Sequence, residues 1–112
     1  MDWNDKDHKK DIKKVINSLF ENILKRSSKK VYRILDKGFK KNVSLNKFEI
    51  LPKYNISLGK LKKINIVNIN KKTRRSMVRA SYLRKGEFCT QNIYLVYQDG
   101  DWKVDAEMLY RN

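Results

Sequence analysis

Apolar residues near the start of the chain recur with the period of an α-helix. They stand three or four positions apart, at Ile12, Val15, Ile16, Leu19, Phe20, Ile23 and Leu24. This spacing predicts a helix with one continuous apolar side, and Asp7 is a suitable residue to cap its start. Lysines occupy the opposite side, so the helix could lie on a membrane surface. Packing on a sheet is favoured, because strands are predicted downstream.

A second, shorter helix is expected after Ser27 or Ser28, either of which can cap it. Gly38 suits the left-handed conformation that ends many helices. The apolar positions of this helix are Val31, Tyr32 and Leu35.

A third short helix is predicted over residues 45–51. Ser44 stands directly before it and can act as its N-cap. Pro52 follows, and a proline disfavours helical geometry at the residue before it. The first half of the chain is therefore predicted to be helical.

From residue 60 onward the apolar pattern changes to the alternation that is typical of β-strands. Four strands are expected, over residues 61–69, 76–84, 88–97 and 102–109. In the second strand, Val78, Ala80 and Tyr82 share one side. The alternation shifts near Val67 and Ile69, which indicates a bulge or a sheet edge.

Two tight turns are predicted between these strands. Asp99-Gly100 separates two runs of aromatic and β-branched residues. An Asp-Gly pair suits a type I′ turn, because both central residues of that turn need positive φ. Residues 85–87, Lys-Gly-Glu, form the other turn. The strands are therefore expected to pair in sequence order as an antiparallel meander.

The 112 residues suffice for one hydrophobic core and are too few for two. We expect a single domain over residues 1–112, with helices over about 8–51 and the sheet over about 61–109. Helices followed by strands define an α+β fold. The first helix is expected to lie across the concave face of a strongly curved, cone-like, four-stranded antiparallel sheet.

The end of the chain carries an apolar strand, a tight turn and the run Gly100-Asp101-Trp102-Lys103-Val104. With the opening helix, the short helix around residues 31–35 and the strand at 61–69, this arrangement resembles the nuclear transport factor 2-like (cystatin-like) superfamily. The likeness is to its small bacterial members, such as lumazine-binding-like domains and assembly-factor domains of type IV secretion and conjugation machines. It implies the cone-like fold and a homodimer through the sheet. It implies no single activity, since the superfamily holds isomerases, dehydratases, transport factors, toxin-immunity proteins and secretion scaffolds.

An isomerase-like activity would need a general base and a hydrogen-bond donor that face each other inside the cone. The only histidine, His8, is expected to be exposed at the start of the first helix. Asp105 and Glu107 are expected on the solvated side of the last strand, although a bulge could turn Asp105 inward beside Tyr82 or Tyr94. We therefore predict no catalytic residue, and keep a small isomerase- or dehydratase-like enzyme as the alternative.

Cofactor and metal sites are not predicted either. The sequence holds no glycine-rich phosphate loop, no cluster of cysteine and histidine ligands and no nucleophile motif. Its single cysteine, Cys89, cannot form an internal disulfide and is expected to be a buried, unreactive thiol.

Charge is the strongest functional signal in the sequence. The formal net charge is +15, from 27 basic and 12 acidic residues. All ten charged residues between positions 60 and 85 are basic, and the eight cations between positions 25 and 41 are accompanied by Asp36 alone. Such an excess can reflect the composition of an A/T-rich genome, or it can mark a surface that binds anions.

The predicted binding site consists of cations at and after the turn between the first two strands. Arginine in such a site can bind a phosphate through two hydrogen bonds. The site comprises Lys71, Lys72, Arg74, Arg75, Arg79, Arg84 and Lys85. We expect it to contact an acidic protein surface or a polyanion, with nucleic acid bound through its phosphate backbone.

Base recognition is not predicted, because no known DNA-reading or RNA-reading motif is present. Tyr82, Tyr94 and Tyr97 could stack on bases, but alternating aromatic residues of a sheet are expected in the core.

The sequence thus predicts a non-catalytic binding or assembly module with a basic surface. The contexts considered are a secretion or conjugation machine, and a phage or mobile element whose protein binds nucleic acid or inhibits an effector. No apolar segment approaches the about 20 residues that span a bilayer. The compartment stays open: the chain is cytoplasmic as written, and extracytoplasmic if an N-terminal signal or anchor was removed.

Overall fold

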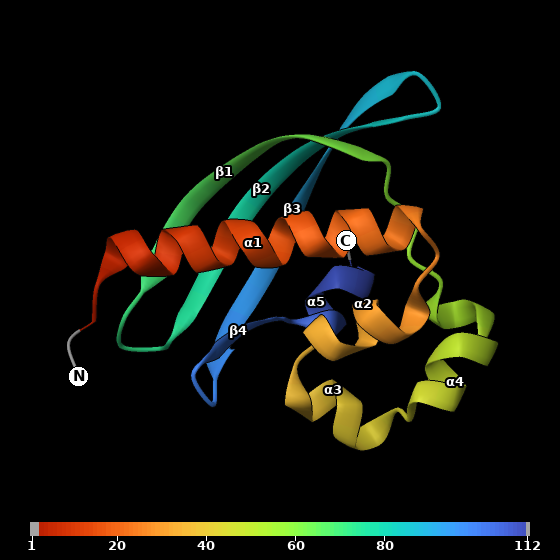
Figure 1. Cartoon of the computed structure of the whole chain (residues 1–112), viewed down its shortest axis with the longest axis horizontal. Coiled ribbons are helices and arrows are strands. Elements are labelled where there is room, and N and C mark those ends of the chain that lie inside the picture. The colour runs from red at the N-terminus through yellow and green to blue at the C-terminus, as the bar shows by residue number, and fades with distance from the viewer. Residues whose placement is uncertain (1–2, 112) are drawn as a thin grey trace.

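The computed structural model describes residues 3–111, in which helices lie on one side of a four-stranded antiparallel sheet (Figure 1). The elements, in chain order, are α1 (Asp5–Leu24), α2 (Ser28–Ile34), α3 (Lys37–Asn42), α4 (Leu45–Ile50), the 3-10 helix η1 (Pro52–Tyr54), β1 (Lys60–Asn70), β2 (Arg75–Arg84), β3 (Glu87–Gln98), β4 (Asp101–Val104) and α5 (Ala106–Arg111). The predicted α+β class is therefore confirmed.

The long helix α1 lies across the sheet (Figure 1). Its apolar side is buried, with Ile12, Ile16 and Leu19 at 0 % and Phe20 at 1 % exposure. Burying four side chains of this size contributes on the order of 6–12 kcal/mol before the entropy of folding is subtracted. The predicted packing of this helix on a sheet is confirmed.

The start of the first helix and the end of the second differ from the prediction. α1 begins at Asp5, because the Asn4 side chain accepts hydrogen bonds from the backbone nitrogens of Lys6 and Asp7; Asp7 is therefore not the N-cap. α2 ends at Ile34, because Leu35 is extended. Gly38 does not end α2 and lies inside α3.

The predicted third short helix is confirmed as α4. The Ser44 hydroxyl accepts a hydrogen bond from the backbone nitrogen of Lys47 at 3.2 Å. The helix stops before Pro52, as expected from the restriction that proline places on the preceding residue.

The strands pair in the order β1-β2-β3-β4, as predicted. Val78, Ala80 and Tyr82 are buried on the side that faces the helices. The sheet is not strongly curled, so the prediction of a strongly curved sheet was wrong. One long helix and one layer of strands cover each other without the sheet closing around it.

Both predicted hairpin turns are present as two-residue turns. Lys85 and Gly86 have φ of 51° and 79°, and Asp99 and Gly100 have φ of 51° and 83°. Two consecutive positive φ values are the requirement of a type I′ turn, which matches the twist of the flanking strands.

The first outer strand of the sheet, β1, has an irregular register, and the other, β4, has part of its free edge occupied. In β1 the register shifts between Leu61 and Lys63 and again between Ile66 and Asn68, which confirms the irregularity predicted near Val67. At the opposite edge, Leu35 pairs with β4 in an isolated parallel bridge.

The last strand is shorter than predicted. β4 ends at Val104, and the residues expected to complete it form α5 instead. Asp105 causes the change, because its Oδ1 accepts a hydrogen bond from the backbone nitrogen of Met108 at 3.2 Å and so caps the new helix. Glu107 consequently lies in α5, paired with Arg111, and not on a strand.

Asp36 holds three elements together, α3, β4 and α5. Its backbone nitrogen donates to the carbonyl of Val104 at 2.8 Å. Its Oδ2 accepts from the backbone nitrogen of Phe39 at 3.0 Å, and its Oδ1 accepts from that of Ala106 at 2.9 Å. One carboxylate therefore caps both α3 and α5 and fixes them against the end of β4.

The short helices enclose an aromatic cluster beside the main core. Its rings lie 5.5–6.4 Å apart between centroids in successive contacts, and belong to Tyr32, Phe39, Phe48, Tyr54 and Tyr110. The Tyr32 hydroxyl donates to the carbonyl of Val43 at 2.6 Å, and the Tyr110 hydroxyl donates to that of Tyr54 at 2.7 Å. Burial, and then the neighbouring Tyr54, raise the pKa of Tyr110.

Replacing Asp36 by Ala should lower the free energy of unfolding by about 1–3 kcal/mol, because each lost N-cap typically costs about 1 kcal/mol. Chemical denaturation followed by circular dichroism measures the loss. Asp36→Asn keeps one side-chain oxygen as acceptor, so its free energy of unfolding should lie between those of the parent protein and Asp36→Ala. Asp11→Ala, at an exposed position of α1, is the matched control; equal midpoints for the Asp36 and Asp11 variants would contradict the capping role.

Tyr110→Phe should lower the free energy of unfolding at neutral pH by about 0.5–1.5 kcal/mol, because the hydrogen bond to Tyr54 is lost. The raised pKa means that the folded protein keeps this phenol proton at a pH where the unfolded chain loses it. The stability that Tyr110 contributes is thus present below the unfolded pKa of about 10 and declines above it. Denaturation curves recorded from pH 7 to about pH 11.5 give the free energy of unfolding of the parent protein and of Tyr110→Phe. The difference between these two free energies should become smaller above about pH 10, and a constant difference would argue against this account.

Candidate functional site

The turn between β1 and β2 is held in a defined shape by backbone hydrogen bonds. The Asn70 side chain accepts from the backbone nitrogens of Lys72 and Thr73, at 3.0 and 3.1 Å. The carbonyl of Arg74, whose φ is 56°, accepts from the backbone nitrogen of Tyr97 at 2.8 Å. The cations of this turn are therefore presented from a fixed backbone.

The structure brings together most of the cations predicted to form the site. Lys71, Lys72 and Arg74 lie exposed in the β1–β2 turn. Arg75 and Arg79 follow on β2, on the side that faces away from the helices, and both are exposed. These five residues form one continuous surface, which we term the basic turn and strand.

Arg84 and Lys85 are separate from that surface. They lie at the other end of β2, at the β2–β3 turn, which is at the upper right of Figure 1 while the β1–β2 turn is at the lower left. The strand between them has ten residues, or about 33 Å at about 3.3 Å per residue. A single small ligand cannot contact both ends.

Within residues 3–111, Arg75 is the member of the basic turn and strand that has an ion pair. Its NH1 lies 3.4 Å from Oδ2 of Asp105. Asp105 is thus occupied by this pair and by the cap of α5, and it does not face the interior beneath α1 as the enzyme alternative requires.

The side of the sheet that faces away from the helices carries no buried residue in β2 or β3. We term this side the open face. Its members on β1, β2 and β3 are Lys60, Lys63, Asn65, Asn68, Asn70, Arg75, Met77, Arg79, Ser81, Leu83, Phe88, Thr90, Asn92, Tyr94 and Val96. These members combine cations, amides and partly exposed apolar side chains and include no acid; Asp105, just after β4, lies beside them and pairs with Arg75.

The three tyrosines expected in the core have three different environments. Tyr82 is in the core at 6 % exposure, and burial is the main cause that raises its pKa. Tyr97 is partly buried against Trp102, with 5.2 Å between ring centroids. Tyr94 lies on the open face, so its prediction as a core residue was wrong; it pairs with Met77 across β2 and β3.

His8 is not exposed as predicted. It is half-buried, and its Nδ1 accepts a hydrogen bond from Nε1 of Trp102 at 3.0 Å. Its ring stacks on Trp3 at 3.7 Å and meets Tyr97 edge-on at 5.0 Å. His8 therefore fastens the start of α1 to the β3–β4 hairpin.

Part of the second basic run is also structural. Lys40 and Lys103 both donate to the carbonyl of Arg33 near the end of α2, at 3.3 and 3.1 Å. Burial, followed by the charge of Lys103, lowers the pKa of Lys40. These ammonium groups satisfy the carboxyl end of a helix, where cations are favourable.

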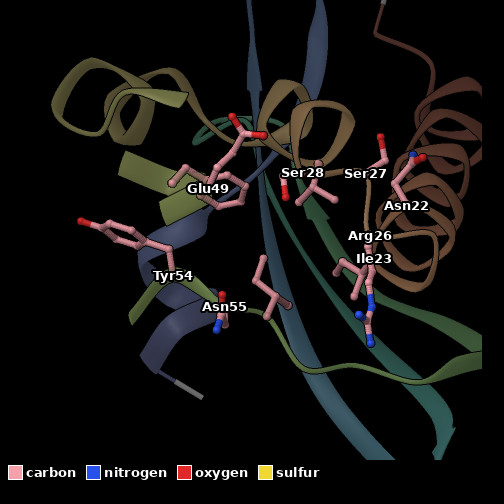
Figure 2. A pocket seen from close by; sticks show the side chains of 11 residues that line it. Asn22, Ile23, Arg26, Ser27, Ser28, Glu49, Tyr54 and Asn55 are labelled. Atoms are coloured by element: carbon pink, nitrogen blue, oxygen red, sulfur yellow. The ribbon is translucent and has the colours of Figure 1, made fainter. Parts of the chain in front are cut away.

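A cavity of about 370 Å³ lies between the end of α1, α2, α4 and residues 54–56 (Figure 2). Its polar lining includes Asn22, Arg26, Ser27 and Glu49. Figure 2 shows Arg26 and Glu49 on opposite sides of it, and both residues are exposed. The cavity therefore lacks the desolvated acid or histidine that a general base requires.

Cys89 is only partly buried, and not fully buried as expected. It lies near the β2–β3 turn and its sulfur is 3.8 Å from the carbonyl of Glu87. Across residues 3–111, no group of three or more histidine, cysteine, aspartate or glutamate side chains is placed to hold a metal ion.

No protein-family model matches the chain, and no curated protein matches it. Among the helices of the described residues, none is both long enough and apolar enough to cross a membrane.

His8→Phe keeps a ring against Trp3 but removes the nitrogen that accepts the hydrogen bond from Nε1 of the buried Trp102. An unsatisfied buried donor costs about 1–3 kcal/mol, so the free energy of unfolding should fall by that amount. Denaturation followed by tryptophan fluorescence measures the change, with Lys9→Ala at the exposed neighbouring position as control. If both variants unfold at the same midpoint, the hydrogen bond does not contribute as described.

Proposed function

We propose that this protein is a non-catalytic binding module that holds a negatively charged partner, a polyanion or an acidic protein surface, on the basic turn and strand. The observation that carries this proposal is that five exposed cations follow one another along one turn and the start of one strand: Lys71, Lys72, Arg74, Arg75 and Arg79. Asp105 pairs with one of them, Arg75. Such a surface attracts anions over about a Debye length, roughly 10 Å at 0.1 M salt.

The environments of the acids support binding over catalysis. The side-chain oxygens of Asp36 and Asp105 accept hydrogen bonds that cap helices, and Asp105 also forms the ion pair with Arg75. The buried residues of α1 and of the sheet are apolar apart from Asn22, Ser76 and the hydroxyl of Tyr82. Within residues 3–111 none of these buried residues is a carboxylate or a histidine, and Nδ1 of the half-buried His8 already accepts from Trp102, so no free base is offered there to abstract a proton.

We further propose that the module is a nuclear transport factor 2-like domain. The long helix across an antiparallel meander, and the Asp99-Gly100 turn that leads into the buried Trp102, support this assignment. An assembly role in a secretion or conjugation machine, or a role in a mobile element, follows from the same resemblance. The resemblance also implies a homodimer through the sheet, and such a dimer would compete with an anionic partner for the side of the sheet that the helices leave uncovered.

The triple variant Arg74→Gln, Arg75→Gln and Arg79→Gln should lose about tenfold or more of its affinity for heparin and for polyglutamate at low salt, because three contacts with the anion are removed. Fluorescence anisotropy over a salt series measures the loss and should show a shallower salt dependence for the variant.

The control removes the same charge from the outer side of α1, as Lys9→Gln, Lys13→Gln and Lys14→Gln, which are all exposed. If the two triple variants lose affinity equally, the charge acts as a general property of the molecule and the site assignment is wrong. If neither the parent protein nor the control binds any anion near physiological salt, the proposed function fails.

A further inference from the structure

The open face is organised in rows that run across the strands. Paired residues of adjacent strands share a side, so the register defines each row. Along β2, the rows are Asn70–Arg75–Val96, Asn68–Met77–Tyr94, Asn65–Arg79–Asn92, Lys63–Ser81–Thr90 and Lys60–Leu83–Phe88. Cations, amides and apolar rings therefore alternate over the full length of the β2–β3 pair.

Tyr94 stands between two arginines in this arrangement. It pairs directly with Met77, and Arg75 and Arg79 flank Met77 on the same side of β2. Diagonal neighbours on one side of a sheet lie about 7–8 Å apart, within reach of long side chains. Arg79 is oriented by a hydrogen bond from its Nε to Oδ1 of Asn92 at 3.3 Å.

Phe88 provides a second ring at the other end of the same strand. Its side chain is 75 % exposed, the largest exposure among the exposed large apolar residues of the described chain. It lies six residues from Tyr94 along β3, or about 20 Å. A ring exposed to this degree is accessible to a planar group that stacks on it.

The charge of the open face favours one class of occupant over a second copy of this chain. A twofold contact would place the face against itself, and would oppose Lys63, Arg75 and Arg79 to the same cations. An anionic chain with planar apolar groups would satisfy both features, because its charges meet the arginines and its planes cover the rings.

Building on the proposed function, we propose that the open face binds single-stranded nucleic acid along the β2–β3 pair. Bases stack on Tyr94 and Phe88, and phosphates contact Arg75, Arg79 and the cations of the β1–β2 turn. Single strands are required because the faces of bases in a duplex are already stacked on each other. The side-chain amides of Asn65 and Asn68 on β1 lie on the same face and can donate to or accept from base edges.

Fluorescence anisotropy with labelled dT12 and rU12, a 12-base-pair DNA duplex, heparin and polyglutamate tests this assignment on the whole chain. We expect one of the single strands to bind about tenfold or more tightly than the duplex. Phe88→Ala and Tyr94→Leu should each weaken single-strand binding by about 5- to 150-fold, the loss of one stacked base, and should leave heparin binding unchanged. Arg79→Gln should weaken binding to every anion.

Phe88→Ala removes an exposed side chain and so tests stacking even if Tyr94→Leu fails to fold; circular dichroism checks both. Equal binding of single strands, duplex and heparin, with no effect of the ring variants, overturns the inference and leaves the proposed function standing. Binding of polyglutamate but not of nucleic acid also overturns the inference and leaves the proposed function standing. A dimer in sedimentation experiments that either ring variant dissociates would assign the face to a second copy. Failure to bind any anion would remove both proposals.

Discussion

The arrangement of the helices around the sheet depends on the carboxylate of Asp36. Its two oxygens accept hydrogen bonds from the first turns of α3 and α5, and its backbone nitrogen donates to the last residue of β4. Two of these three bonds connect Asp36 to residues about seventy positions later in the sequence, Val104 and Ala106. They hold the start of α3 and the start of α5 at the end of β4, next to the aromatic cluster that contains Phe39 and Tyr110.

The same geometry divides the molecule by chemistry. The helices cover the apolar positions of one side of the sheet, and two acids, Asp36 and Asp105, cap helices. The members of the open face on β1, β2 and β3 are cations, amides, other uncharged side chains and two accessible rings, with Asp105 beside them paired to Arg75. A high net charge alone would say little about function. Because most acids lie elsewhere, positive charge is concentrated at the basic turn and strand, and an anionic partner is attracted to that part of the surface.

Local rules predicted most of the fold. Periodicity located α1 and the first three strands, Ser44 and Pro52 bounded α4, and the glycine turns were found from their need for positive φ. The errors lie where a distant partner decides the outcome. Leu35 extends because it pairs with β4, and residues 106–111 form a helix because Asp36 and Asp105 cap them. His8 is half-buried because Trp102 supplies a hydrogen bond across 94 positions.

The candidate site was predicted in part for the same reason. The cations of the β1–β2 turn are adjacent in sequence, so their proximity follows from the turn alone, whereas the distance of Arg84 and Lys85 depends on the length of β2. The role of Tyr94 depends on which side of β3 the helices cover. The alternation of side chains along a strand shows which residues share a side, but it does not show which of the two sides the helices cover.

The irregular edges of the sheet restrict how any partner can be recognised. Two register shifts in its pairing with β2 make the edge strand β1 irregular, and Leu35 already occupies part of the edge of β4. An incoming strand that extended the sheet would have to follow an irregular strand at one edge and a partly occupied strand at the other, so addition of a foreign strand to the sheet is disfavoured. Recognition is then left to side chains, and substitutions on β1, β2 and β3 can change what the protein binds without altering the backbone that presents them.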